Sequence, residues 1–164
     1  MTLAVTSYDF SVFLHVTAVV VGFGATFAES VMFPVAMKMS PRNLPYMHRL
    51  QLTINQYFAN PALLIVIVTG IYQMSEGNWE WGDFWVSGTL LIALIVGAIN
   101  GGFFIPSDRR LLPIAERDIE AAGSGEVELS REYLDKVKVQ GILGPVVGVL
   151  LVIAIFLMVT KPGL

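Results

Sequence analysis

Two ionisable residues, His15 and Glu29, lie inside long apolar stretches of this sequence. Titratable side chains are costly in hydrocarbon, so such residues are candidates for ligand binding, proton transfer or metal ligation. His15 is followed at helical spacing by Ala18, Gly22 and Ala25. Small side chains at that spacing let a neighbouring helix, or a flat macrocycle, approach the backbone closely. His15 is therefore the predicted cofactor-binding residue of the chain.

Three roles are open to the imidazole of His15. It can form a packing hydrogen bond with a hydroxyl group at similar depth, and the candidates are Thr69, Tyr72 and Thr89. It can ligate haem b or a metal ion, because neutral imidazole is a common ligand. It can also relay protons between neighbouring groups. The sequence leaves these alternatives open.

The spacing of the two histidines excludes a haem that both of them ligate. His48 lies near the other end of the second predicted span, about 20 Å or more from His15 along the helix axes. The second ligand would instead be Met74, Met158, Lys161 or the His15 of a second copy of the chain. A zinc site of the usual kind needs three or four closely placed ligands, which the sequence does not provide.

A second polar group is predicted near the opposite end of the membrane from His15. Residues of the second span at spacings of four, three and four share one helical face. We expect this face to turn toward the bundle interior and Arg49 to pair with Glu29. The seam either holds helices together or forms a path for a solute, an ion or protons. This predicted polar seam comprises Glu29, Arg49, Thr53, Gln56, Asn60 and Asn100.

The elements that must position these residues are four membrane-spanning helices. The 164 residues are 55% hydrophobic and only 14% charged, against about 25% charged in soluble domains. Segments of roughly 20 mostly apolar residues can span the bilayer. Such segments occur at about 10–32, 50–74, 84–105 and 142–160, and a partly helical loop is expected at about 107–140. The predicted fold is a single all-α domain, a four-helix transmembrane bundle with up-down topology.

The placement of basic residues predicts the orientation. Nine of the ten Lys and Arg residues fall in the loops 33–49 and 106–141, and only Lys161 lies on the other side. Basic loops remain in the cytoplasm. We therefore expect a multi-pass protein of the cell (inner) membrane with both loops cytoplasmic and both termini outside. The tryptophan-rich segment 76–85 suits the outer interface.

Several short segments together resemble the bacterial predicted integral membrane proteins grouped as domain of unknown function 2269. The resemblance covers nearly the whole chain, and the family implies no established activity. It rests on Leu14-His15-Val16, Thr69-Gly70, Trp79-Glu80-Trp81-Gly82-Asp83-Phe84-Trp85-Val86-Ser87 and Pro106-Ser107-Asp108-Arg109-Arg110-Leu111.

A more distant resemblance links the chain to the copper-resistance D membrane domain and to the haem-binding membrane protoporphyrinogen oxidase. The shared features are a His early in the first span and a Thr-Gly that closes the second. In the oxidase a first-span His and a later Lys are implicated at the haem, and this resemblance implies the same role for His15. The match stops there, because residues 84–105 contain neither Lys nor His.

Three function classes follow from these observations. The first is a non-catalytic membrane subunit or assembly module, which acts with a second copy or a membrane-protein partner. The second is a redox protein that binds b-type haem or a metal through His15. The third is a small-solute or ion carrier that uses the polar seam. The lipid bilayer is the expected surroundings, nothing indicates nucleic-acid binding, and the sequence does not decide whether the protein is an enzyme.

Overall fold

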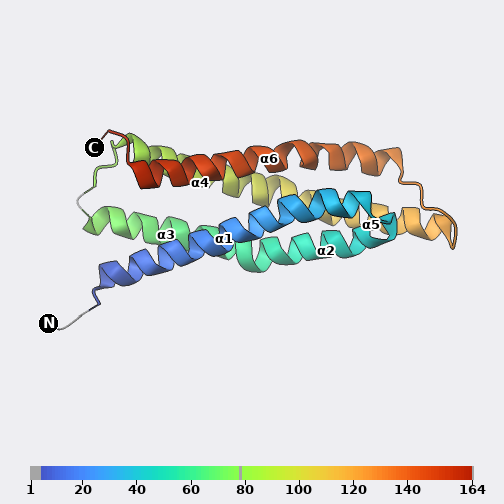
Figure 1. The fold of residues 1–164 in the computed structure, drawn as a ribbon, viewed down its shortest axis with the longest axis horizontal. Helices are drawn as coiled ribbons and strands as arrows, with labels where there is room; N and C mark the ends of the chain where they lie inside the picture. The colour runs from blue at the N-terminus through green and yellow to red at the C-terminus, as the bar shows by residue number, and fades with distance from the viewer. Residues whose placement is uncertain (1–4, 78, 164) are drawn as a thin grey trace.

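The computed structural model describes residues 5–77 and 79–163, and its described part contains helices and no strand. Four long helical rods run antiparallel, as the predicted up-down bundle requires (Figure 1). Asn78 of the tryptophan-rich loop lies outside the described residues. The elements are α1 (Ser7–Lys38), η1 (Pro41–Asn43), α2 (Leu44–Ile54), η2 (Asn55–Ala59), α3 (Asn60–Glu76), α4 (Phe84–Ile99), η3 (Asn100–Phe104), α5 (Ile105–Ala122) and α6 (Arg131–Thr160).

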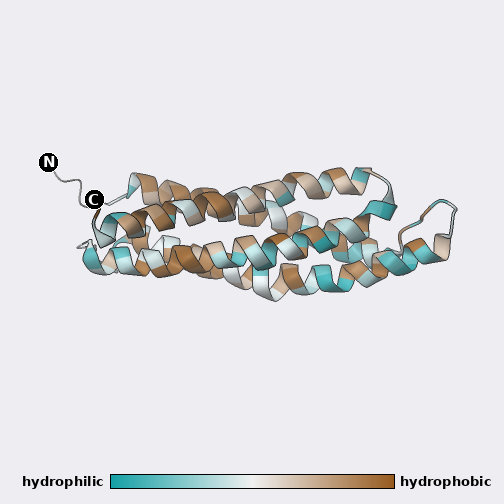
Figure 2. Ribbon diagram, turned by 90° about the horizontal axis from the view of Figure 1, so that it is seen from below, coloured by the Kyte–Doolittle hydropathy of each residue, from teal (hydrophilic) through white to brown (hydrophobic). Residues whose placement is uncertain are grey.

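The rods are longer than a membrane is thick. They contain 32, 36, 39 and 30 residues, so each is roughly 45–58 Å long at 1.5 Å per residue. The hydrocarbon layer is only about 30 Å thick. Hydrophilic residues gather toward the end that carries the α1–α2 and α5–α6 connections (Figure 2). All four rods are long and apolar enough to span a membrane, and we call this hydrophilic end the basic end and the opposite one the Trp end.

Two of the rods contain a π-helical turn just before a proline. The turn η2 precedes Pro61, and the turn η3 precedes Pro106. A proline lacks the amide proton for the helical hydrogen bond, and its ring clashes with the carbonyl group four residues earlier. A π turn widens the helix at that point and absorbs the mismatch. The rods therefore continue across both prolines, but the faces before and after each π turn are rotated.

The helix ends follow ordinary capping chemistry. Thr6 begins α1 in a capping box with Asp9, and Ser130 caps α6 by accepting a hydrogen bond from the amide of Tyr133. The helix α5 ends before Gly123, whose φ of 55° suits glycine. Pro113 lies inside α5, because span three continues without a break into this helix.

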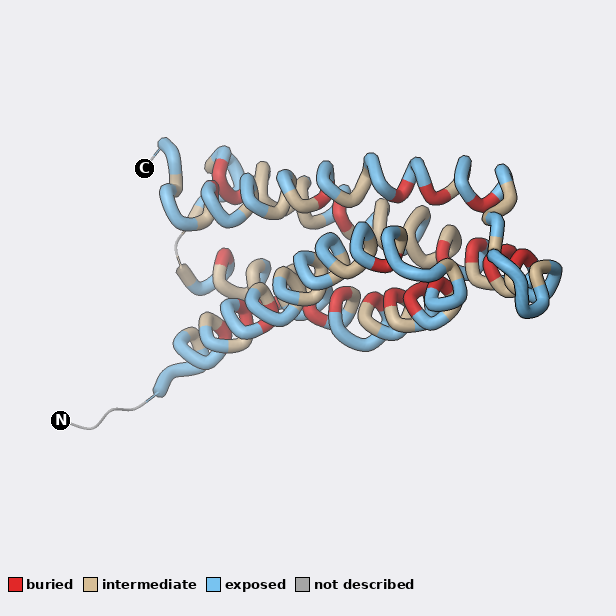
Figure 3. The backbone as a smooth tube through the Cα atoms, turned by 45° about the vertical axis from the view of Figure 1, so that its right-hand side comes forward, coloured by how far each residue is buried: buried red, intermediate tan, exposed pale blue. Residues whose placement is uncertain are grey.

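The helices pack as two pairs that are joined at the basic end. The helix α1 packs mainly against α3, and α4 against α6 (Figure 1). Buried residues are concentrated toward the basic end, where α2 and α5 also meet (Figure 3). The core there includes Leu44, Leu111, Ala115 and Tyr133. This end is packed like a soluble domain, while the two pairs are less closely packed along the apolar part of the bundle.

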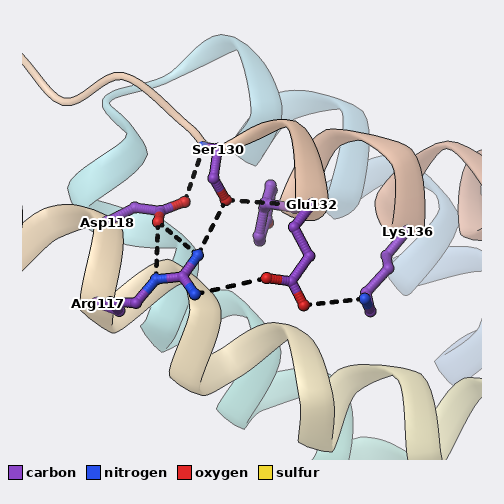
Figure 4. Close-up of polar contacts among 6 residues, drawn as sticks. Arg117, Asp118, Ser130, Glu132 and Lys136 are labelled. Carbon is purple, nitrogen blue, oxygen red and sulfur yellow. Dashed lines mark hydrogen bonds and ion pairs between the residues drawn. The ribbon is translucent and has the colours of Figure 1, made fainter.

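A polar cluster closes the loop between α5 and α6 (Figure 4). Oδ2 of Asp118 accepts from the backbone amide of Ser130 at 2.8 Å, and Oδ1 accepts from Arg117 at 3.1 Å. Arg117 also reaches Glu132, which pairs with Lys136 at 3.1 Å. Burial opposes ionisation of Asp118, but the hydrogen bonds from Ser130 and Arg117 outweigh it and hold the pKa of this carboxyl below its usual range.

We expect Asp118→Asn to lower the stability of the basic end by about 1 kcal/mol, a value reduced because Arg117 is half exposed. A carboxyl with a lowered folded-state pKa stabilises the fold above its unfolded pKa of about 3.9, and this contribution is lost as the pH falls through the folded value. In thermal unfolding in detergent, the wild type should have a higher unfolding temperature than Asp118→Asn at pH 7, and the two unfolding temperatures should become equal in strong acid. A gap that widens on acidification would contradict the assignment.

Candidate functional site

A ladder of polar contacts joins α1 to α3 near the Trp end. Its members on α1 are four residues apart: Ser7, Ser11 and His15. The hydroxyl of Ser11 contacts the backbone carbonyl of Thr69 at 3.5 Å, and Tyr72 donates to Ser7 at 3.1 Å. Nδ1 of His15 lies 2.9 Å from Oγ1 of Thr69. Of the three hydroxyl partners predicted for His15, the structure therefore selects Thr69.

The hydrogen bonds of Thr69 define which nitrogen of His15 carries the proton. Oγ1 of Thr69 is 2.6 Å from the carbonyl oxygen of Ile65, so its single proton is used in that bond. Oγ1 must then accept a hydrogen bond from the Nδ1–H group of His15. The other nitrogen, Nε2, is left with a free lone pair. It is buried and has no hydrogen-bond partner among the described residues.

The ring of His15 borders a cavity of about 460 Å³ at the Trp end, which we call the Trp-end cavity. Gly70 lies against the ring, and a Cβ atom there would stand 3.5 Å from Cε1. The cavity is lined mostly by apolar side chains. All three residues named as second-ligand candidates in this chain line it as well: Met74, Met158 and Lys161.

Aromatic rings and one cation border the same cavity. The ammonium group of Lys161 lies 4.1 Å from the ring centre of Trp79 and 5.2 Å from that of Trp85, which is within cation–π range. Nε1 of Trp85 is buried and has no partner in the described chain. The Trp-end cavity thus combines an imidazole lone pair with an indole N–H and an ammonium group.

A second cavity of about 230 Å³ lies closer to the basic end, and we call it the basic-end cavity. Glu29 lines it, together with Asn55 and Asn100. Nδ2 of Asn55 donates to the carboxyl group of Glu29 at 3.0 Å, and Asn100 donates to Asn60 at 2.8 Å. The two cavities share wall residues, among them Thr89. They lie in succession along the gap between the two helix pairs.

The predicted polar seam is only partly assembled. Arg49 does not pair with Glu29; it contacts Glu116 at 2.6 Å and its side chain is 67% exposed. Thr53 and Gln56 are also exposed, and Thr53 donates to the carbonyl group of Arg49. The expectation that this face of span two turns inward is therefore wrong for these three residues. The structure keeps Glu29, Asn60 and Asn100 at or near the basic-end cavity.

The inward face of span two carries a different polar stripe. Its members His48, Gln51 and Asn55 have the spacings three and four, and all three are buried. The charged residue Arg49 belongs to the part of α2 beyond the apolar segment, where water is available. Gln56 lies within the π turn η2, where the residue positions depart from those of a regular α-helix. The access of Arg49 to water and the π turn at Gln56 together explain why the predicted stripe does not face the interior.

The structure also shows a buried network that the sequence interpretation missed. His48, Asp108 and Tyr133 have no exposed surface. Nδ1 of His48 lies 3.0 Å from Oδ1 of Asp108, and Nε2 lies 2.8 Å from the hydroxyl of Tyr133. Gln140 donates to the same Oδ1 at 2.8 Å. The network joins α2, α5 and α6.

Protonation within the network follows from its chemistry. Burial, with Asp108 and Asp118 nearby, raises the pKa of Tyr133, so its hydroxyl keeps its proton and can donate to Nε2 of His48. The Nδ1–H of His48 then donates to Asp108. The sequence signal was the helical spacing of two sets of positions, i, i+4, i+7 for 133, 137 and 140 and i, i+3, i+7 for 108, 111 and 115, which predicts inward faces in the loop 107–140. The sequence interpretation treated this segment as a partly helical loop and did not consider Asp108 as a buried residue.

No group of three or more His, Cys, Asp or Glu side chains that could hold a metal ion occurs in the part of the chain that the structure describes. A metal in this protein would therefore depend on few protein ligands. Haem meets that condition, because its porphyrin supplies four nitrogen ligands and the protein supplies only the axial positions.

We expect His48→Ala to destabilise the protein by roughly 3–5 kcal/mol, because it leaves the buried carboxyl group of Asp108 without its main partner. Tyr133→Phe removes one hydrogen bond and should cost about 1 kcal/mol. Denaturant titration in detergent measures both losses. Tyr46→Ala on the exposed side of the same helix is the control, and an equal loss in this variant and in His48→Ala would show that the network contributes little.

Comparison with known proteins identifies the family. Residues 10–162 match the family model described as "Predicted integral membrane protein (DUF2269)". No curated protein and no solved structure matches the chain. The matched segment includes most of α1 and the other three rods in full, and with them His15, Thr69 and Glu29. The protein is a polytopic integral membrane protein that belongs to this family, and the resemblance to this family noted from the sequence is confirmed.

Proposed function

We propose that the protein is a redox membrane protein that binds b-type haem, or a related metal group, in the Trp-end cavity through Nε2 of His15. The observation that carries the proposal is the free lone pair of this nitrogen. A buried nitrogen without a partner costs free energy unless a ligand satisfies it. Its other ring nitrogen donates to Thr69, and such a bond is usual for a metal-ligating histidine.

The other groups around the cavity fit the same ligand. Met74, Met158 and Lys161 are the side chains in this wall that can serve as a second axial ligand. Haem also carries two carboxylates, and the indole N–H of Trp85 and the ammonium group of Lys161 are suited to bind them. The remaining wall is apolar, as expected for a porphyrin site.

The residues of the chain have separate tasks in this proposal. Bound haem would supply one-electron chemistry. Thr69 holds the ring of His15 in one orientation and raises the basicity of Nε2. The apolar walls exclude water, which together with the axial ligand sets the reduction potential. We also propose that the basic end is cytoplasmic, which places the Trp-end cavity in the outer half of the membrane.

The test is the visible spectrum of protein purified from haem-replete cells. The wild-type chain should show a Soret band, and His15→Ala should lose it. Thr69→Val should retain the fold and reduce haem affinity by about 10–100-fold, because it removes the hydrogen bond that orients the ring. Thermal unfolding of the same samples verifies that the variants are folded.

The matched control is Thr89→Val. Thr89 lines the same cavity, but its hydroxyl donates to the carbonyl group of Trp85 at 2.6 Å. This variant should keep its Soret band. A colourless, folded wild-type protein, or equal losses in the two threonine variants, would contradict haem ligation by His15.

A second candidate function is a non-catalytic membrane subunit, and the glycines favour it. Gly22 packs against another helix of the same chain, since a Cβ atom there would lie 3.1 Å from Cβ of Ala62. Gly24, Gly101 and Gly102 have open space at the same position. Small residues with no helix over them permit close approach of another transmembrane helix. The carrier function is supported less, because Arg49, Thr53 and Gln56 are exposed.

If the glycines form an association surface, Gly102→Leu should dissociate an oligomer or complex while the chain stays folded, because no atom of another described segment lies within 4 Å of a Cβ atom placed at Gly102. Native mass measurement in mild detergent reports the assembly, and thermal unfolding reports the fold. The control is Val20→Leu at an exposed apolar position of α1. A wild-type protein that is monomeric in the native extract would argue against this function.

A further inference from the structure

The basic-end cavity is bordered by hydrogen-bond acceptors that have no donor. Gln51 and Gln140 both line it, and they are 7% and 4% exposed. Their side-chain oxygens are buried without a partner among residues 5–77 and 79–163. Glu29 adds a carboxyl group to the same wall. Buried acceptors of this kind are usually satisfied, so the cavity calls for a ligand that donates hydrogen bonds.

The orientation of the Gln140 amide is determined by its neighbour. Its Nε2 donates to Oδ1 of Asp108 at 2.8 Å, and a carboxylate can only accept such a bond. Rotating the amide would place two oxygen atoms against each other. Oε1 of Gln140 is therefore the atom left free, and the buried network of His48 and Asp108 holds it in place.

Among the described residues that line the cavity, Glu29 is the only ionisable side chain, and it is acidic. Arg49, the counter-charge expected from the sequence, pairs with Glu116, and neither residue lines the cavity. The carboxyl group of Glu29 instead accepts a hydrogen bond from the neutral side-chain amide of Asn55 at 3.0 Å. A buried carboxylate without a basic partner is costly, and either a proton or a bound cation neutralises it.

The size and the walls of the cavity restrict the ligand further. Its volume of about 230 Å³ lies below the roughly 300–1,000 Å³ of drug-sized sites. The space is also larger than a bare metal ion needs, and Phe23, Phe33 and Phe104 contribute apolar surface. We propose that the basic-end cavity binds a small organic ammonium ion, with its N–H groups on Glu29, Gln51 and Gln140 and its apolar body against the phenylalanines.

Phenethylammonium is the probe, because it joins a primary ammonium group to one aromatic ring. Equilibrium dialysis against the purified full-length protein in detergent measures its binding. Two analogues separate the contributions: phenethyl alcohol has no charge, and the trimethylated ammonium has the charge but no N–H donor. We expect one saturable site for the primary ammonium and at least about tenfold weaker binding of both analogues.

Two variants test the place of binding. Glu29→Gln keeps the size of the side chain and should lower the affinity for phenethylammonium by about tenfold or more. Gly144→Leu keeps every polar group: Gly144 lines the cavity, and a Cβ atom there meets nothing within 4 Å. The larger side chain should fill the space and abolish saturable binding. The matched control is Glu126→Gln, at an exposed position in the α5–α6 loop, and it should bind like the wild type.

The proposal is overturned if the wild-type protein shows no saturable binding, if phenethyl alcohol binds as tightly as the ammonium, or if Gly144→Leu retains full affinity. If Glu29→Gln fails to fold, the Gly144→Leu comparison decides alone. The haem test at His15 is independent of these outcomes, because it concerns a different cavity and a different readout.

Discussion

The buried carboxyl group of Asp108 is the constraint on which the arrangement of the helices depends. One oxygen atom accepts from His48 on α2 and from Gln140 on α6, while Asp108 itself belongs to α5. Tyr133 completes the network through His48. A buried acidic group keeps its place only while its partners do, so three helices share one fixed point at the basic end.

The region beyond this fixed point has little to force close packing. In lipid there is no hydrophobic driving force between helices, and association depends on small residues and interhelical hydrogen bonds. The α1–α3 pair has both, in the ladder of Ser7, Ser11 and His15 and in the contact of Gly22 with Ala62. Between the two pairs the side chains leave the Trp-end and basic-end cavities. The basic end can hold the pairs in register while the interior stays open to ligands.

The sequence was sufficient to predict the fold and part of the candidate site. Long apolar runs and their separation predict four antiparallel helices, and the depth of His15 predicts its hydroxyl partners, of which Thr69 is the one observed. Glu29 and Asn100 were placed at similar depth, and both line the basic-end cavity. These predictions hold because they depend on distance along a helix, which the 1.5 Å rise fixes.

The rotation of the helices could not be predicted in the same way. On span two the stripe that begins at Arg49 and the stripe that begins at His48 are both polar and both regular, so periodicity alone does not say which one faces inward. Two facts decide it: the charged residue can reach water beyond the membrane, and the π turn before Pro61 alters the helix after Ile54. Neither the neighbour Asp108 nor the π turn is visible in a hydropathy pattern, and without them the buried network was missed.

The two cavities differ in the groups they leave unsatisfied, and this difference separates the ligands proposed for them. At the Trp end the space is lined by His15, Trp85 and Lys161, and Nε2 of His15 and the indole N–H of Trp85 have no partner among the described residues. At the basic end the unsatisfied groups are the oxygens of Gln51 and Gln140, beside the carboxyl group of Glu29. A ligand with a metal and carboxylates complements the first set, whereas a cation with N–H donors complements the second. Exchanging the two ligands would place like charges together in a medium of low dielectric constant, where repulsion is strong. Adjacent cavities in one small bundle can therefore remain selective without a barrier between them.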